Sequence, residues 1–326
     1  MACELLMAGF VMHTPSSVTR DPESSRINIL GSGFASSVKT RLLSAIARSP
    51  LSWRLNFSVD ASVGDRPIKV PVLLGRGYQN LSIGEPWLFR AFSKVLGLRP
   101  GAFVDVGVNL GQTLIKVKLI DRSRAYFGFE PNPECSQYVT ELIKINGFND
   151  CTLFPVGLSS SASVATLFAK NDAVDPSASL VPGFRTADRY QRRQYVPVFP
   201  GDTLLADVER IALLKIDVEG GELDVIAGML GTLARCSPII FCEILPVFDE
   251  STENGSFRLR RQNALLAHLR SLDYAVFRMM HDESVVELAG IETHSDLALT
   301  NYAFVPAAEV DRFRRLFKTV TSSATA

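Results

Sequence analysis

From residue 85 onward, short apolar runs alternate with segments of helical spacing, and this alternation constrains the fold more than any other feature. The apolar runs are AFVDVG, RAYFGFE, CTLFPVGLS, ALLKIDVEG and IIFCEI. Segments with helical periodicity lie between them, for example PNPECSQYVTELIKIN and ELDVIAGMLGTLARC. Strand-length runs that alternate with helices predict βαβ units and a parallel sheet.

The C-terminal part of the chain has a different pattern. DYAVFRMM and NYAFVP are predicted to be two further strands, joined by the turn-rich stretch 281–300. Two strands connected in this way can pair in the antiparallel sense. The sequence therefore predicts an α/β fold, an open doubly wound sheet with a hairpin at its edge.

The chain divides at about residue 80 into a less regular and a regular part. Residues 1–84 are interpreted as an N-terminal extension, partly disordered, with a helix expected around 36–48. Within it, IKVPVLLGRGYQNLSI resembles a hairpin with GRG as its turn. Residues 85–310 form the predicted main domain, and 311–326 are expected to be the end of a helix and a tail.

Charge and cysteine content limit the classes of function. Lys and Arg number 34, and so do Asp and Glu, which argues against general binding to nucleic acid or to an anionic membrane. No window approaches the length of a membrane span. The five cysteines include no C-x-x-C pair, so they signal neither a disulfide framework nor a zinc site. We therefore expect a cytoplasmic protein, whose oligomeric state the sequence leaves open.

Residues that directly follow the apolar runs are the candidates for ligand binding. Ligands of open α/β sheets bind beyond the carboxyl ends of the strands, where strand order reverses. The candidates after the first two runs are Asp105, Gly107, Asn109, Gly111, Gln112, Thr113, Glu130, Pro131 and Asn132. Asp217 follows the fourth run, and Glu243 lies at the end of the fifth.

The turn after the first run argues against a dinucleotide. It has the form D-x-G-x-N-x-G, which lacks the middle glycine that a pyrophosphate requires. Asp105 would repel a phosphate but can accept a hydrogen bond from an ammonium group. Glu130, at the end of the next strand, can accept two ribose hydroxyls. A cationic ligand with an amino-acid part and a ribose fits both residues, and S-adenosylmethionine is such a ligand.

Four acids follow the fourth run in LLKIDVEGGELDVI. Glu222 and Asp224 lie in the first turn of a predicted helix, where the helix dipole favours negative charge. Asp217 and Glu219 precede that helix and are candidates for a general base or for a group that orients an acceptor hydroxyl. Glu243 completes the candidate catalytic group. A minor alternative is that Asp217, Glu219 and Glu243 bind Mg²⁺, although no spacing rule assigns a metal site here.

Other polar residues are weaker candidates. His281 follows a predicted strand and is an alternative base. The basic clusters, among them RYQRRQY, are interpreted as solvated helix or loop surface. The less favoured alternative is an acceptor phosphate or carboxylate held by Arg185, Arg189, Arg192 and Arg193, with Tyr190 and Tyr195 stacking on a sugar.

FVDVGVNLGQT, FGFEPNPE, FPVGLS and especially LLKIDVEGGELDVI resemble FkbM-type S-adenosylmethionine-dependent methyltransferases. The resemblance covers about 85–305, and KIDVEGGE is its most specific part. It implies a Rossmann-like, seven-stranded sheet. It also implies that Asp105, Gly107, Asn109, Gly111 and Thr113 line the methionine and ribose side of the cofactor, with Glu130 at the ribose and Asn132 near the adenosine. Val108 departs from the family pattern, which more often has Ala there.

The resemblance implies an O-methyltransferase that acts on a hydroxyl of a carbohydrate or secondary metabolite. Two alternatives stay open at this point. One is a non-catalytic binding protein on a methyltransferase scaffold, because fold does not guarantee chemistry. The other is a nucleotide-cofactor oxidoreductase, against which the missing glycine counts.

Overall fold

The computed structural model describes residues 27–28, 54, 56–63, 66–170, 174–185 and 190–320. The helix expected at 36–48, most of the first thirty-odd residues and the final six lie outside the described residues. These expectations, and the domain boundary near residue 84, stay predictions.

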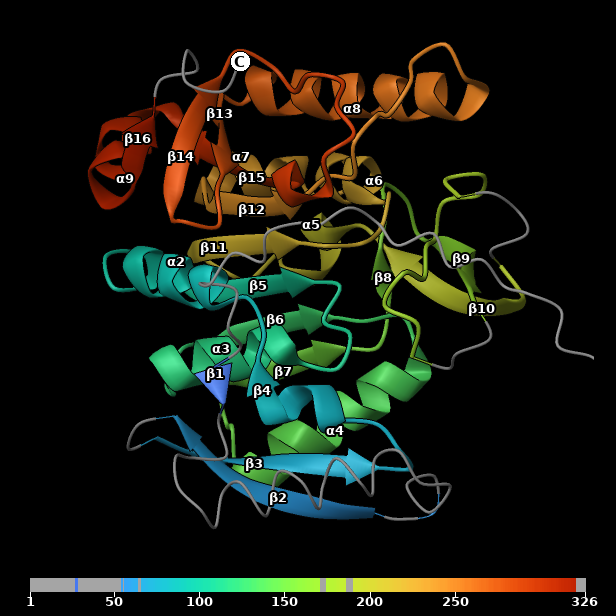
Figure 1. Ribbon diagram of the computed structural model, residues 1–326, viewed down its shortest axis with the longest axis vertical. Coiled ribbons are helices and arrows are strands. Elements are labelled where there is room, and N and C mark those ends of the chain that lie inside the picture. Colours follow the sequence, from blue (N-terminus) through green and yellow to red (C-terminus); the bar gives the residue numbers. More distant parts are fainter. Residues whose placement is uncertain are drawn as a thin grey trace, which may run out of the picture.

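A mixed sheet forms the centre of the described structure, with nine strands in the order β16-β14-β13-β15-β12-β11-β5-β6-β7 (Figure 1). Five adjacent strands are parallel: β12 (Ile239–Glu243), β11 (Ile211–Ile216), β5 (Ala102–Val106), β6 (Tyr126–Phe129) and β7 (Cys151–Phe154). The α/β fold predicted from the alternating pattern is confirmed.

The C-terminal strands extend this sheet on one side. β15 (Asn301–Pro306) is antiparallel to both β12 and β13 (Tyr274–Met279), so the expected antiparallel pair is confirmed. The seven strands from β7 to β13 match the number that the resemblance implies. Two more lie beyond them, β14 (Ser284–Leu288) and β16 (Lys318–Val320). Both are short, and β14 lies in the stretch that was expected to be turns.

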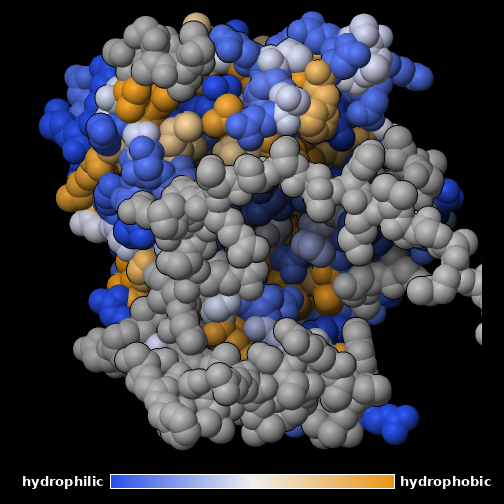
Figure 2. Space-filling model, in the orientation of Figure 1, coloured by the Kyte–Doolittle hydropathy of each residue, from blue (hydrophilic) through white to orange (hydrophobic). Residues whose placement is uncertain are grey.

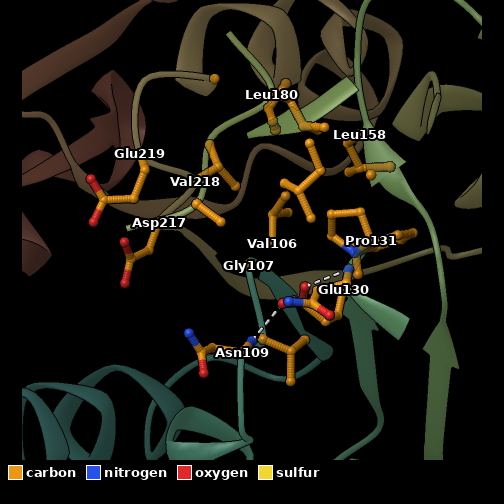
Figure 3. Close-up of a pocket in the computed structure, with 18 of the residues that line it drawn as sticks. Val106, Gly107, Asn109, Glu130, Pro131, Leu158, Leu180, Asp217, Val218 and Glu219 are labelled. Atoms are coloured by element: carbon orange, nitrogen blue, oxygen red, sulfur yellow. Dashed lines mark hydrogen bonds between the residues drawn. The ribbon is translucent and has the colours of Figure 1, made fainter. Parts of the chain in front are cut away.

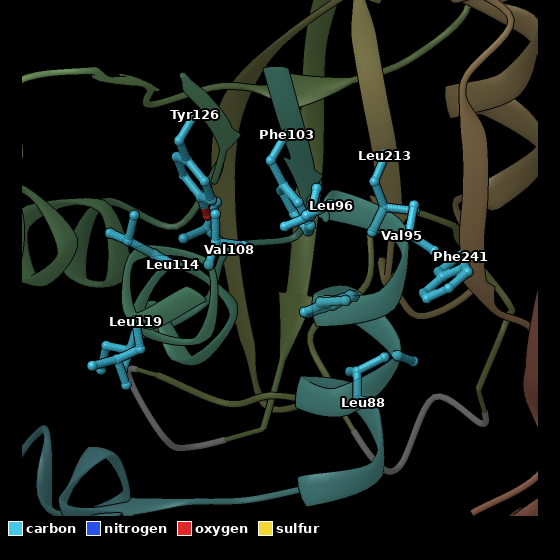
Figure 4. Packing of buried hydrophobic residues seen from close by; sticks show 14 of the residues in the cluster. Leu88, Val95, Leu96, Phe103, Val108, Leu114, Leu119, Tyr126, Leu213 and Phe241 are labelled. Atoms are coloured by element: carbon cyan, nitrogen blue, oxygen red, sulfur yellow. The ribbon is translucent and has the colours of Figure 1, made fainter. Parts of the chain in front are cut away.

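Helices cover both faces of the sheet, because neighbouring residues of a strand point to opposite sides. On β5, Phe103 belongs to one hydrophobic cluster and Val104 to the other. The first cluster includes residues of α2 (Pro86–Leu96), α3 (Gln112–Ile120), α4 (Pro133–Asn146) and α9 (Val310–Leu316). Figure 4 shows side chains of three neighbouring strands facing α2: Phe103, Leu213 and Phe241.

The second cluster packs α6 (Glu222–Ala227), α7 (Leu230–Cys236) and α8 (Glu253–Ser271) on the opposite face. A single helix was predicted over 222–236, and this was wrong. The chain breaks at Gly228, which lies so close to the Ser159 carbonyl that an added Cβ would be 2.1 Å from that oxygen. Long-range packing therefore divides a segment of continuous helical spacing. The four-residue helix α5 (Gly201–Leu204) packs beside α7.

A small sheet lies beyond the carboxyl ends of the parallel strands. β10 (Arg192–Phe199) pairs with β9 (Ser163–Ala169) and with β8 (Gly157–Leu158). The prediction of a helix or loop face for RYQRRQY was wrong, because its last four residues belong to β10. There Val196 and Val198 are buried while Tyr195 and Pro197 are exposed, a period of two.

The described N-terminal part packs against α4. β2 (Asn56–Val63) and β3 (Arg66–Leu73) form an antiparallel hairpin, and the Tyr138 hydroxyl of α4 donates a hydrogen bond of 2.8 Å to the Pro71 carbonyl. The hairpin predicted over 68–83 was therefore wrong in its pairing, because β3 pairs with β2 and not with the residues that follow the GRG turn. After a tight turn at Gly75 and Gly77, both with positive φ, the 3-10 helix Tyr78–Leu81 leads away to β4 (Ser82–Ile83). β4 pairs with β1 (Ile27–Asn28) instead of β3.

Among the described residues, none of the helices combines the length and the hydrophobicity that a bilayer crossing requires.

Candidate active site

A cavity of about 680 Å³ lies beyond the carboxyl ends of β5, β6, β11 and β12. The face shown in Figure 2 is hollowed near its centre, and both hydrophilic and hydrophobic side chains are visible inside the hollow. Residues of the segment 174–182 and of the small sheet, such as Leu167 and Val198, form part of its wall. The predicted site residues that line it are Gly107, Asn109, Gln112, Thr113, Glu130, Pro131, Asn132, Asp217, Glu219 and Glu243. Asp105 and Gly111 are predicted residues that do not line it.

Glu130 is held at the end of β6 by the backbone. Its two carboxylate oxygens accept hydrogen bonds from the N–H groups of Asn109, at 2.7 Å, and Asn132, at 2.8 Å (Figure 3). Burial raises the pKa of Glu130 to about 7, against the lowering effect of the two N–H groups. The carboxylate is thus fixed in position at the cavity wall, and each oxygen retains a further lone pair as acceptor.

The helices that follow β5 and β6 begin at the cavity. The Asn132 side chain caps α4 by accepting from the Glu134 N–H at 3.0 Å, and Pro133 occupies the first helical position. Gly107 has a φ of +91°, and a Cβ there would lie 1.9 Å from the carbonyl oxygen of Asp217. Only glycine allows the β5 turn to approach the end of β11 this closely.

Asp105 lies beneath the cavity and is fully buried. Its Oδ2 accepts a hydrogen bond of 2.5 Å from the Tyr126 hydroxyl, and Lys215 Nζ lies 4.0 Å from its Oδ1. Burial raises the pKa of Asp105 to about 6, although Lys215 and the Tyr126 hydrogen bond oppose the shift. Asp105 therefore contributes negative charge from below and does not border the cavity itself.

The opposite end of the cavity is acidic. In Figure 3 the carboxylates of Asp217 and Glu219 lie together, away from Glu130, Pro131 and Leu158. Asp217 Oδ2 is 2.9 Å from Lys215 Nζ, and Glu219 forms an ion pair with Arg185. Burial raises the pKa of Glu219, although Arg185 opposes it.

Glu243 is the third acid at this end. Its Oε1 accepts a hydrogen bond of 3.2 Å from the Thr300 hydroxyl. Burial, and then the negative charges of Asp217 and Glu219, raise the pKa of Glu243 to about 8. A carboxyl group with such a pKa exchanges protons near neutral pH.

Residues 105–279 match the family model of the FkbM methyltransferase domain, more than half of the 326 residues. The chain belongs to the FkbM methyltransferase family.

Solved structures of methyltransferases are similar to the FkbM chain at low sequence identity. An FkbM methyltransferase from Methylobacillus flagellatus KT is 17% identical with a TM-score of 0.39, over 64% of this chain and 45% of that chain. An S-adenosylmethionine-dependent O-methyltransferase from Thermotoga maritima is 13% identical with a TM-score of 0.33, over 68% of this chain and 65% of that chain. The alignment thus spans less than half of the first of these proteins. Comparison with curated protein sequences finds no match.

The sequence reasoning missed the cations of the candidate site. Lys215 precedes Asp217 by two positions, so both side chains leave β11 on the same face, and this spacing was a usable signal. Lys116 is buried at the cavity wall and pairs with Glu85, with 3.0 Å between Nζ and Oε2. Burial lowers the pKa of Lys116, against the effect of Glu85. Because Glu85 precedes Lys116 by thirty-one residues, local sequence gives no sign of this pair.

The magnesium alternative has no geometric support. Within the described part of the chain, no group of three or more His, Cys, Asp or Glu side chains is arranged to hold a metal ion. Asp217 and Glu219 instead pair with Lys215 and Arg185.

The weaker candidates are engaged elsewhere. His281 is exposed and stacks on Trp87, with 5.1 Å between ring centroids, and is not among the described residues that line the cavity. Arg185 pairs with Glu219 and Arg192 with Glu134, while Arg189 lies outside the described residues. Tyr190 packs on Phe168, and Tyr195 is 79% exposed on the outer face of β10.

Proposed function

We propose that the protein is an S-adenosylmethionine-dependent O-methyltransferase that acts on a hydroxyl of a small molecule, a carbohydrate or a secondary metabolite. The observation that carries this proposal is the difference in polarity between the two ends of the cavity. One end has a fixed carboxylate beside apolar side chains, and the other end has three acids.

The first end fits an adenosine. Glu130 has free lone pairs at the cavity wall for two ribose hydroxyls, as the bidentate acceptor that a vicinal diol requires. Pro131, Leu158 and Leu180 lie beside it and offer apolar contact to an adenine ring (Figure 3). The turn Gly107–Asn109 runs between this end and Asp217, where the close approach of two backbones leaves no room for a side chain at residue 107.

The second end fits a positive charge and a proton transfer. Bound S-adenosylmethionine supplies a methyl group activated by a sulfonium. Asp105 and Asp217 provide negative charge near that group, and the acids that line the cavity can orient an acceptor hydroxyl and accept its proton. Because Arg185 and Arg192 are already paired with carboxylates, a neutral hydroxyl compound fits this end better than a phosphate or carboxylate.

Thermal melting with S-adenosylmethionine, S-adenosylhomocysteine and NAD, each added separately, tests the proposal. A ligand at one hundred times its dissociation constant stabilises a protein by about 2.7 kcal/mol, which raises the Tm by a few degrees. We expect a shift with the first two ligands and none with NAD. A shift with NAD alone would contradict the cofactor assignment.

Turnover separates the enzyme from a binding protein on the same scaffold. Transfer of a radioactive methyl group from S-adenosylmethionine to members of a panel of sugars and phenols is the expected result. Binding of the cofactor without transfer to any hydroxyl compound would favour the non-catalytic alternative. The family assignment leaves no support for a nucleotide-cofactor oxidoreductase.

A further inference from the structure

The three acids at the far end of the cavity differ in their partners. Asp217 faces the ammonium of Lys215 at 2.9 Å, and Glu219 faces the guanidinium of Arg185. Among the described residues, Glu243 has no cation within salt-bridge distance, and its hydrogen-bond donor is the hydroxyl of Thr300 at 3.2 Å. The carboxylates of Asp217 and Glu219 are thus each held by a cation, whereas that of Glu243 is not, and this pairing distinguishes Glu243 from the other two.

The order of the strands places Glu243 farthest from the ribose end. Glu130 follows β6, and β5, β11 and β12 follow in that order across the sheet. Adjacent strands are about 4.8 Å apart, so three steps place the backbone of Glu243 about 14 Å from that of Glu130. An acceptor must approach the methyl group from the side opposite the sulfur. With the ribose at Glu130, the strand order puts the end of β12 on the far side of the cavity, where an acceptor has room to approach from that side.

We propose that Glu243 is the general base of methyl transfer, and that Lys215 and Arg185 keep Asp217 and Glu219 as fixed counter-charges. This proposal rests on the function proposed above. In the reaction the acceptor oxygen forms a bond to the methyl carbon, and the carbon–sulfur bond breaks with its electron pair left on sulfur. The proton of the hydroxyl moves to the Glu243 carboxylate, and the products are a methyl ether and S-adenosylhomocysteine.

The charges around Glu243 are consistent with this role. Asp217 directly after β11, Glu219 in the following turn and Glu85 before α2 raise its affinity for a proton, while Lys215 lowers it. A base is most effective when its pKa lies near the working pH, and burial with these neighbours brings the pKa of Glu243 to about 8. The arrangement allows the proton to be accepted during transfer and released to solvent afterwards.

Binding of two cofactor analogues tests the proposal without knowledge of the acceptor. S-adenosylhomocysteine lacks the methyl group, whereas sinefungin carries an amine-bearing carbon in place of the methylsulfonium. The amine of sinefungin therefore reports on the charges that face the methyl position. Dissociation constants of both analogues are measured by calorimetry at pH 8 for the wild type and for Glu243→Gln, Asp217→Asn and Glu219→Gln. Glu209→Gln serves as the control, because Glu209 is exposed and precedes β11 at the opposite edge of the sheet.

We expect Glu243→Gln to weaken sinefungin by about tenfold, equivalent to about 1.4 kcal/mol, with little change for S-adenosylhomocysteine. Asp217→Asn and Glu219→Gln should change the ratio of the two constants less, and Glu209→Gln should leave it unchanged. If Glu243→Gln does not fold, Glu243→Asp, which retracts the charge by one methylene, should weaken sinefungin selectively in the same sense.

The possible failures are distinguishable. Suppose that both analogues still bind, but the ratio of their dissociation constants is unchanged in the Glu243 variants or changes more in Asp217→Asn. The assignment of Glu243 as the base would then be overturned, while the proposed function would stand. Binding of neither analogue to the wild type would overturn the proposed function, and the role of Glu243 with it.

Discussion

Lys215 and Asp217 form an ion pair at the point where β11 leaves the sheet, with 2.9 Å between Nζ and Oδ2. The same ammonium group lies 4.0 Å from the fully buried carboxylate of Asp105 on β5. One cation therefore balances two acids on neighbouring strands, one below the cavity and one at its wall.

Replacement of Lys215 by Met should destabilise the protein. The side chain of Lys215 is 12% exposed and that of Asp105 is 0% exposed, so the variant leaves a buried carboxylate without its cation. We expect the free energy of unfolding at pH 7.5 to fall by about 3 kcal/mol, measured by urea denaturation.

This loss should shrink at pH 5, because Asp105, whose pKa is about 6, can then be neutralised by a proton. Lys118→Met is the matched control: Lys118 is also buried, but its Nζ donates to the backbone carbonyls of Arg122 and Arg124. The loss caused by the control should vary little with pH. An equal pH dependence in both variants would contradict the role of Lys215.

Replacement of Gly107 by Ala should separate the ends of β5 and β11. The φ of +91° disfavours any side chain, and the new Cβ would lie 1.9 Å from the Asp217 carbonyl oxygen. We expect a loss of about 2 kcal/mol or more in unfolding free energy, together with loss of S-adenosylhomocysteine binding.

Gly147→Ala provides the comparison for this variant. Gly147 also has a positive φ, +59°, but a Cβ there would meet no atom within 4 Å. The expected cost is about 1 kcal/mol with cofactor binding retained. If both variants were equally mild, the close approach of the two strands would not be a constraint on the site.

Replacement of Glu222 by Gln should stabilise the protein above neutral pH. Glu222 is 7% exposed, its Oε1 accepts a hydrogen bond of 2.8 Å from the Gly220 N–H, and burial raises its pKa to about 7. A carboxyl whose pKa is raised by folding contributes stability that is full below its unfolded pKa, about 4, and is lost as the pH rises through about 7. The amide of Gln keeps the hydrogen bond and removes this pH dependence.

Urea denaturation at pH 5 and pH 8.5 measures the effect of this change. The variant should exceed the wild type by on the order of 2 kcal/mol at the higher pH and be similar to it at the lower pH. A variant that is less stable than the wild type at pH 8.5 would show that the charge of Glu222 is needed by the helix start.

The edge of the sheet at which the site lies could be predicted because it follows from local patterns. Apolar runs of strand length end at Asp105, Glu130 and Asp217, and parallel strands bring their carboxyl ends to one edge. The sequence could not separate their environments: Asp105 lies within β5 (Ala102–Val106) and is fully buried beneath the cavity, where it accepts a hydrogen bond from Tyr126.

The features that were not predicted depend on long-range contacts. The end of α6 at Gly228 depends on Ser159, sixty-nine residues earlier. The pairing of Arg185 with Glu219 depends on how the segment before β10 folds back over the turn after β11. Neither contact has a signal in the local spacing of residues. The hairpin of β2 and β3 was misassigned because the GRG turn predicted at 75–77 follows β3, which pairs with β2 and packs on α4.

The affinity for S-adenosylhomocysteine should rise with pH through about 7 if Glu130 binds the ribose hydroxyls. The pKa of Glu130 is about 7 because of burial, and only the ionised carboxylate offers acceptor lone pairs on both oxygens. Below that pH a proton occupies one of the oxygens, so the dissociation constants from calorimetric titrations at pH 6 and pH 8.5 should differ by about tenfold.

Glu130→Gln should bind S-adenosylhomocysteine weakly at both pH values, because an amide offers one acceptor oxygen and one donor nitrogen. Glu141→Gln, on α4 and with a side chain that is 37% exposed, should behave as the wild type. Glu130→Gln should also lower the Tm by a few degrees. The Gln amide has only one acceptor oxygen, whereas the Glu130 carboxylate accepts from the Asn109 and Asn132 N–H groups with two. Cofactor affinity that is independent of pH in the wild type, with Glu130→Gln equally tight, would remove Glu130 from the binding site.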